Sequence, residues 1–208
     1  MSSSTPARYP ERVPRWEPGS RERLQTAALE LFAEQGFEKT TVLDIAARAG
    51  VTRRTFFRHF PDKREVLFDG EADLRAELTQ AVAQAPDGLQ PLDILLRAFR
   101  KAGRVLEESR PYSEPRLEVI AATPALHERE LAKAAKLTDA IADALRQRRV
   151  ASRLASLAAQ AGWATFHQAL QAWIDDPSQN LDTHLTQAFD DLRALSAPAL
   201  PAEAGPGS

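Results

Sequence analysis

"TVLDIAARAGVTRRTFFRHF", residues 41–60, contains two short segments with helical spacing, separated by a tight turn. Thr41 is a favourable helix N-cap, and Asp44 three residues later completes a shortened capping box. Gly50 is suited to end the first segment, because glycine readily adopts the left-handed backbone that follows many helices. Thr52 is a favourable cap for the second segment. The stretch therefore predicts two short helices joined by a turn at residues 50–52, the arrangement of a helix-turn-helix.

The second predicted helix has two chemically different faces. Phe56 and Phe60 are four residues apart and share a face with Val51, so we expect them in the core. The opposite side carries arginines, whose paired N–H donors match guanine O6 and N7, and a threonine methyl that can touch thymine. Hydroxyl, imidazole and ammonium groups at the edges suit the phosphate backbone. The predicted DNA contacts are Thr40, Thr41, Thr52, Arg53, Arg54, Thr55, Phe57, Arg58, His59 and Lys63. The alternative is a solvated arginine-rich face.

Helical periodicity extends along the rest of the chain. Ser20 is the expected N-cap of a first helix that ends at Gly36. β-branched residues are sparse and strand-like alternation is absent, so we expect an all-α protein of about nine helices. Besides the first three, the predicted helices cover residues 62–84, 91–109, 115–122, 125–148, 151–174 and 179–195.

The charge distribution favours a polyanion-binding N-terminal part. The net charge is −2 over 208 residues, but residues 1–64 hold 12 Lys and Arg against 8 Asp and Glu. The remaining 15 basic and 21 acidic residues make the larger part acidic. A basic end on an acidic body is typical of nucleic-acid binding, although chance clustering of surface charge also produces it.

The sequence contains few features that would indicate a catalytic or metal-binding site. The chain has no cysteine, and none of its four histidines stands in a metal-ligand spacing such as HExxH. There is no Gly-rich phosphate loop and no GxSxG motif. We therefore expect no enzyme activity, no cofactor and no metal. No secretory signal or membrane span is evident, so the expected location is the cytoplasm.

Composition predicts the domain organisation. Residues 1–19 and 196–208 are rich in Pro, Ser or Gly, and we expect a disordered arm and a disordered tail there. Residues 20–64 are the expected helix-turn-helix domain, and residues 65–195 the expected ligand-binding and dimerisation domain. Arginines in the arm are candidates for reaching DNA, although a passive tail is the alternative: Arg8, Arg12 and Arg15.

An apolar ligand site in the larger domain is a further hypothesis. Arg116 and His127 are candidate polar anchors for such a site. The apolar candidates are Leu95, Phe99, Trp163, Phe166 and Leu170. The alternative for each of the aromatic side chains is an ordinary place in the hydrophobic core.

Residues 41–68, "TVLDIAARAGVTRRTFFRHFPDKREVLF", resemble the DNA-binding signature of TetR-type transcriptional repressors. The preceding "LELFAEQGFEKTTV" resembles the first helix of that family, so the similarity covers about residues 20–68. The resemblance implies an all-helical homodimer with a small DNA-binding domain and a larger ligand-binding domain. The family usually has tyrosine at the position of Phe57, where the hydroxyl commonly meets a phosphate.

The resemblance also implies that the last two helices form the dimer interface. Helix 151–174 has a stripe of small residues that allows close helix approach, and helix 179–195 has an apolar stripe. The expected interface residues are Ala158, Ala161, Gly162, Thr165, Ala169, Leu185, Phe189 and Leu192. The alternative is that both stripes fill the core of a single subunit.

Residues 116–145 are similar to the C-terminal domain of a TetR subgroup that includes mycofactocin-associated regulators. Because that subgroup includes binders of long-chain acyl-CoA, an apolar or acyl-CoA-like effector is implied. The resulting hypothesis is a dimeric repressor that binds a palindromic operator and leaves it when a small apolar ligand binds, with activation left open. The alternative is a helical dimeric scaffold or protein-interaction module without sequence-specific DNA binding.

Overall fold

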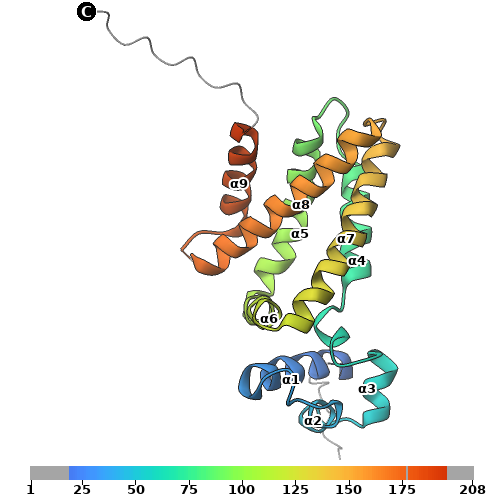
Figure 1. Ribbon diagram of the computed structural model, residues 1–208, viewed down its shortest axis with the longest axis vertical. Coiled ribbons are helices and arrows are strands. Elements are labelled where there is room, and N and C mark those ends of the chain that lie inside the picture. The colour runs from blue at the N-terminus through green and yellow to red at the C-terminus, as the bar shows by residue number, and fades with distance from the viewer. Residues whose placement is uncertain (1–18, 177, 196–208) are drawn as a thin grey trace, which may run out of the picture.

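The computed structural model describes residues 19–176 and 178–195, and within these ranges it contains nine α-helices, one 3₁₀ turn and no strand (Figure 1). The all-α prediction is confirmed. The predicted arm, apart from Gly19, and the predicted tail lie outside the described residues. In chain order the elements are α1 (Ser20–Gln35), α2 (Val42–Arg48), α3 (Arg53–His59), η1 (Glu65–Leu67), α4 (Glu71–Ala83), α5 (Pro91–Glu108), α6 (Arg110–Ala122), α7 (Pro124–Gln147), α8 (Ser152–Asp175) and α9 (Leu181–Leu195).

Helices α1, α2 and α3 form a small bundle at one end of the molecule, where α1 lies between α2 and the larger domain and α3 stands beside α1 (Figure 1). Leu24 and Phe32 of α1, Ile45 of α2 and Phe56 of α3 are buried together in one hydrophobic core. Burial of such side chains stabilises the bundle by roughly 1.5–3 kcal/mol each relative to exposure. Among the described residues, α2 and α3 pack mainly on each other and on α1, which leaves their outer sides exposed.

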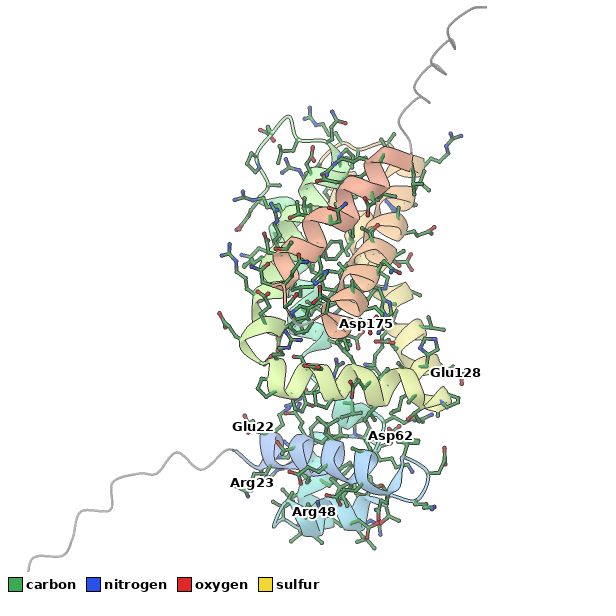
Figure 2. All side chains as sticks on the ribbon, turned by 90° about the vertical axis from the view of Figure 1, so that its left-hand side faces the viewer. Glu22, Arg23, Arg48, Asp62, Glu128 and Asp175 are labelled. Atoms are coloured by element: carbon green, nitrogen blue, oxygen red, sulfur yellow. The ribbon has the colours of Figure 1, made fainter. Side chains whose placement is uncertain are left out.

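The core of the small bundle continues into the larger domain. Val66, Leu67 and Phe68 belong to it, and so do Ile120 at the end of α6 and Leu126 at the start of α7. Figure 2 shows α6 lying along α1 at this junction. Hydrophobic packing thus places residues 66–68 with the N-terminal core, beyond the boundary predicted after residue 64.

The helix predicted over residues 62–84 is interrupted in the structure. Asp62 begins a turn, since its Oδ1 accepts hydrogen bonds from the backbone N–H groups of Arg64, at 2.7 Å, and Glu65, at 3.2 Å. After η1, Gly70 adopts a left-handed conformation with φ of 84°, and α4 begins at Glu71. The prediction of a continuous helix was wrong because periodicity alone does not register the break at this glycine.

Helices α4 to α9 surround a second hydrophobic core. Phe99 of α5 lies at its centre, stacked on Phe166 of α8 with 4.7 Å between ring centroids and tilted against Phe189 of α9. Trp173 is also fully buried there. In the described part of the chain, no helix is long and apolar enough to cross a membrane.

Candidate DNA-binding face and ligand cavity

Local hydrogen bonds fix the helix-turn-helix as predicted. The Thr41 hydroxyl accepts from the Asp44 N–H at 3.2 Å, and the Asp44 carboxylate accepts from the Thr41 N–H at 2.8 Å, which completes the capping box. Gly50 has a φ of 65° in the turn. Thr52 caps α3 by accepting from the Thr55 N–H at 3.1 Å. These bonds set the start of each helix and so the direction in which α3 presents its side chains.

The two faces of α3 separate as expected. Phe56 and Phe60 are buried in the bundle core, and Phe57 on the outer side is 45% exposed. The Arg53 guanidinium lies 5.4 Å from the centre of the Phe57 ring, a cation–π arrangement. This outer side of α3 is therefore a mixed arginine and aromatic surface.

The arginines of this surface are not neutralised by acids. Arg53, Arg54 and Arg58 are exposed, and none of them forms an ion pair with any residue that the structure describes. By contrast, Arg48 of α2 (Figure 2) is bound to Glu34 and Glu30 of α1, and these bonds raise the pKa of Arg48. The α3 arginines thus remain available for an external polyanion.

Thr40 and Lys63 have roles inside the protein. The Thr40 side chain is 1% exposed, and its hydroxyl bonds to the Gly36 carbonyl at 2.9 Å, so the predicted phosphate contact from this hydroxyl was wrong. The Lys63 Nζ donates to the carbonyls of Phe37, at 2.7 Å, and Thr40, at 3.1 Å. These two residues hold the loop between α1 and α2, which places the start of α2.

His59 also supports the bundle. Its Nε2 lies 2.8 Å from the Ser20 hydroxyl, which links the end of α3 to the start of α1. Ser20 was predicted as the N-cap of α1, but the cap is Gly19 and Ser20 is the first helical residue. The Ser20 hydroxyl bonds across the bundle because it is not needed at the helix end. The phosphate contact predicted for His59 stays a prediction.

A cavity of about 380 Å³ lies in the larger domain, beside the junction with the small bundle. It is enclosed by α4, α5, α6, α7 and α8 and by the segment 68–70. This volume is in the range of small-molecule sites. Four of the predicted lining residues border it: Arg116, Trp163, Phe166 and Leu170.

Three predicted lining residues do not border this cavity. Leu95 and Phe99 are fully buried. Leu95 packs closely on Gly162, since a Cβ added to Gly162 would lie 2.7 Å from Leu95 Cδ1. His127 borders a separate hollow of about 40 Å³ and lies 3.7 Å from Glu130. For Phe99 the core alternative was right, and Leu95 lies in the same core.

The sequence analysis did not identify several residues that border the cavity, because they do not belong to a strong apolar stripe. Phe68 and Tyr112 supply aromatic surface, and Lys133 supplies a cation that binds Glu65 and Glu71. Arg116 donates through Nε to the backbone carbonyl of Leu67. The described residues contain no cluster of His, Asp or Glu that could hold a metal ion.

Most residues predicted for the dimer interface are buried inside one subunit. Gly162 faces Leu95 of α5, and Phe189 contacts Phe99. The buried members of the predicted set are Ala158, Gly162, Thr165, Ala169, Leu185 and Phe189, and only Ala161 and Leu192 are partly exposed. The prediction for the six buried residues was wrong because the stripes pack on α5 of the same chain. The outer side of α8 instead exposes Leu154 (50%) and Leu157 (61%).

Comparison with known proteins agrees with this architecture. Residues 24–69 match the family model of bacterial regulatory proteins of the tetR family, and residues 89–197 match that of the MftR C-terminal domain. The chain belongs to the TetR family. It is a DNA-binding transcriptional regulator, built from a TetR-type helix-turn-helix and an MftR-type C-terminal domain.

Individual TetR-family relatives match different parts of the chain. The regulator TcmR of Streptomyces glaucescens is 42% identical over 87 residues, which is 41% of this chain and 38% of TcmR. A Mycobacterium tuberculosis protein assigned as the mycofactocin biosynthesis regulator MftR is 29% identical over 88% of this chain and 93% of its own.

Solved TetR-family structures share the fold. SmeT, a repressor from Stenotrophomonas maltophilia solved in complex with triclosan, gives a TM-score of 0.64 at 25% identity, over 91% of this chain and 100% of SmeT. Thermus thermophilus FadR, a TetR-family repressor in complex with lauroyl-CoA, gives 0.53 at 27% identity, over 90% of this chain and 100% of FadR.

Proposed function

We propose that this TetR-family regulator is a homodimeric repressor that binds a palindromic operator through α3 and leaves it when a small apolar or acyl ligand occupies the cavity. The observation that carries the proposal is the outer side of α3, where exposed arginines form no ion pair with any described residue. Helix α3 belongs to the small bundle at one end of the molecule (Figure 1). The site of action is the cytoplasm, where operator DNA is accessible. Repression follows from competition with the transcription machinery for the same DNA.

Base recognition is assigned to the first turn of α3. Arg53 and Arg54 lie there, and in helix-turn-helix proteins this part of the helix enters the major groove. Each guanidinium offers the donor pair that fits guanine O6 and N7, and the Thr55 methyl is available to a thymine methyl. The Phe57 ring beside Arg53 restricts the freedom of that side chain, which lowers the entropy lost on binding.

Phosphate contacts are assigned to the edges of the motif. Thr41 and Thr52 are exposed at the N-terminal ends of α2 and α3, where backbone N–H groups favour anions. Arg58 lies one turn after Arg54, and His59 follows it. Lys63 donates to the Phe37 and Thr40 carbonyls, which leaves the third hydrogen of its ammonium group for a phosphate. These contacts set the position of α3 on the duplex and make binding sensitive to salt.

A second copy of the chain is assigned to the outer side of α8. Leu154 and Leu157 are exposed there one turn apart, and Leu195 at the end of α9 is exposed as well. Covering these leucines removes apolar surface from water. The dimer that results presents two α3 helices, and two half-sites about one helical turn apart (~34 Å) then give a palindromic operator.

The cavity is assigned to the effector. Its apolar wall from α8 and its position beside residues 68–70 place a ligand next to the connection between the two domains. The structural relatives SmeT and FadR were solved with triclosan and lauroyl-CoA, which supports an apolar or acyl ligand here. A ligand shifts the protein away from its DNA-binding state only if it binds the other state more tightly, by about 1–3 kcal/mol in typical cases.

Selection of bound fragments from the source genome tests the proposed function. The purified protein is incubated with sheared genomic DNA, and the recovered fragments are sequenced and then measured one by one for binding at several salt concentrations. Enrichment of a shared inverted repeat with salt-dependent affinity supports the proposal. Recovery of random fragments at every salt concentration contradicts it and favours a scaffold without sequence-specific binding.

A further inference from the structure

Arg116 is a cation in the cavity wall that lacks an anion. Its Nε donates to the Leu67 carbonyl, and its guanidinium lies 5.8 Å from the centre of the Phe68 ring. Within the described residues it forms no ion pair. Burial lowers the pKa of Arg116, and the nearby Tyr112 and Glu130 offset this effect only in part. A half-buried cation without an ion pair is costly, so the site is suited to an external anion.

Tyr112 supplies a second unsatisfied polar group next to this cation. It precedes Arg116 by four residues on α6, so both side chains project from one side of the helix, and both border the cavity. The Tyr112 hydroxyl is buried and has no hydrogen-bond partner in the described structure. A buried hydroxyl normally finds a partner, and because Tyr112 and Arg116 are near enough to interact electrostatically, a carboxylate bound to Arg116 is a candidate partner.

The acids around the cavity do not take this place. Asp69 is bound by Arg21 and Gln25, and Glu71 is bound by Lys133. Glu130 lies near enough to Arg116 to raise its pKa, but its contact within ion-pair distance is with His127, at 3.7 Å. Two further carboxylates, those of Asp73 and Glu77, border the cavity from α4. That helix packs mainly on α5 and α7. Lys133 of α7 also borders the cavity, but it is paired with Glu65 and Glu71, so within the described residues Arg116 of α6 is the cavity cation left for an external anion.

The rest of the cavity suits an apolar chain or ring. Trp163, Phe166 and Leu170 of α8 form one wall, and Val105 and Leu106 of α5 form another. Val105 is 54% exposed, so the cavity is open to solvent beside α5. A molecule with one charged end and one apolar end would satisfy both regions at once.

We propose that the cavity binds an amphiphilic carboxylate, whose carboxylate pairs with Arg116 and the Tyr112 hydroxyl and whose apolar part lies along Trp163 and Phe166. This inference rests on the proposed function, in which the cavity is the effector site. The Arg116 guanidinium then binds both the ligand carboxylate and the Leu67 carbonyl of η1. The ligand therefore competes for the side chain that holds η1 against α6. Ligand binding thereby loosens the connection to the DNA-binding bundle.

Binding of decanoate and 1-decanol to the full chain, measured by calorimetry without DNA, tests the inference. The two probes share a ten-carbon chain and differ in the charge at one end. A charge-assisted pair with Arg116 is expected to make decanoate bind about tenfold more tightly than decanol. Equal affinities overturn the inference, and so does tighter binding of decylammonium, which would point to Asp73 and Glu77 as the polar anchors.

Two variants and one control test which residues produce the preference for decanoate over decanol. Arg116→Met is expected to abolish the preference for decanoate while decanol still binds, which also reports that the cavity is folded. Tyr112→Phe leaves Arg116 in place and is expected to weaken decanoate about threefold without changing decanol. Arg129→Gln alters the junction outside the cavity and is expected to keep the full preference. A preference for decanoate that survives in both Arg116→Met and Tyr112→Phe overturns the inference.

Operator binding, measured separately, distinguishes failure of the inference from failure of the proposed function. Saturating decanoate is expected to lower operator affinity in the wild type and not in Arg116→Met. Normal operator binding without any preference for decanoate removes the inference and leaves the proposed function standing. A preference for decanoate in a protein that selects no operator supports the carboxylate site and removes the proposed function. A preference for decanoate without any change in operator affinity removes the link through Leu67.

Discussion

Arg129 of α7 binds Glu65 of η1 across the junction between the two domains, with 2.6 Å between Nε and Oε1. Lys133, one turn further along α7, lies 3.2 Å from the other oxygen of the same carboxylate. Burial alone would raise the pKa of Glu65, but the hydrogen bonds from these two cations outweigh it and leave the pKa below its usual value. Glu65 therefore joins the DNA-binding bundle to the larger domain by charge, beside the hydrophobic contacts of residues 66–68.

Glu65→Gln is expected to lower the free energy of unfolding at neutral pH by about 1–2 kcal/mol, between the values for exposed and buried pairs. Because the folded-state pKa is lowered, the contribution of Glu65 is present above its unfolded pKa of about 4.3 and is lost as pH falls through the folded-state value. Urea unfolding of both proteins from pH 7 to pH 3 measures this. Asp143→Asn, which breaks an exposed pair with Arg146 within α7, is the control and should change little. Equal stability of wild type and Glu65→Gln at pH 7 would show that the pair contributes nothing.

Arg54→Ala is expected to weaken binding to the selected operator by about 1–3 kcal/mol and to relax the base preference at one position of each half-site. The reason is loss of a paired donor group from the first turn of α3. Fluorescence anisotropy with operator variants measures both effects. Arg97→Ala removes an exposed arginine from α5, far from α3, and serves as the control. Unchanged operator affinity in Arg54→Ala would show that Arg54 does not contact a base.

Phe57→Tyr restores the hydroxyl usual in the family and is expected to tighten operator binding by about 0.5–1.5 kcal/mol. The exposed position of the ring allows the hydroxyl to reach a phosphate oxygen. Because the added hydrogen bond is to the DNA phosphate backbone, affinity should rise equally for operator and unrelated DNA. Phe57→Leu keeps an apolar side chain without a hydroxyl and should not tighten binding. Weaker binding of the tyrosine variant would place residue 57 against an apolar part of the DNA.

Leu157→Glu is expected to convert the dimer to a monomer, because it places a charge on the exposed leucine surface of α8. Operator affinity should fall with it, since one α3 then contacts one half-site. Analytical ultracentrifugation at micromolar concentration gives the mass. Leu131→Glu changes a similarly exposed leucine on α7 and should leave the dimer intact. A dimer that persists in Leu157→Glu would locate the interface elsewhere.

The helix-turn-helix could be predicted from the sequence because its determinants are local. Thr41 and Asp44 bond to each other's backbone three residues apart, and the Thr52 hydroxyl accepts from the Thr55 N–H at the start of the next helix. The positive φ of Gly50 follows from a residue type that tolerates it. Each of these signals depends on residues within a few positions, so no knowledge of the rest of the fold is needed.

The dimer surface and the cavity could not be predicted in the same way. Periodicity identifies which residues of α8 share a face, but not which helix covers that face. Gly162 therefore looked like an interface residue, while its partner is Leu95 of the same chain. Tyr112 and Arg116 border the cavity together with residues of α8, and Arg116 bonds to Leu67, although Leu67 and α8 are distant in sequence. Sequence spacing does not contain that information.

Operator spacing tests the central claim most directly, namely that two α3 helices of a dimer read two half-sites on one face of DNA. The affinity of the protein is measured for the selected inverted repeat and for the same repeat with about five base pairs, half a helical turn, inserted at its centre. The insertion turns the second half-site to the opposite side of the duplex and is predicted to weaken binding at least to the level of a single half-site. Equal affinity for both DNA molecules would contradict the claim.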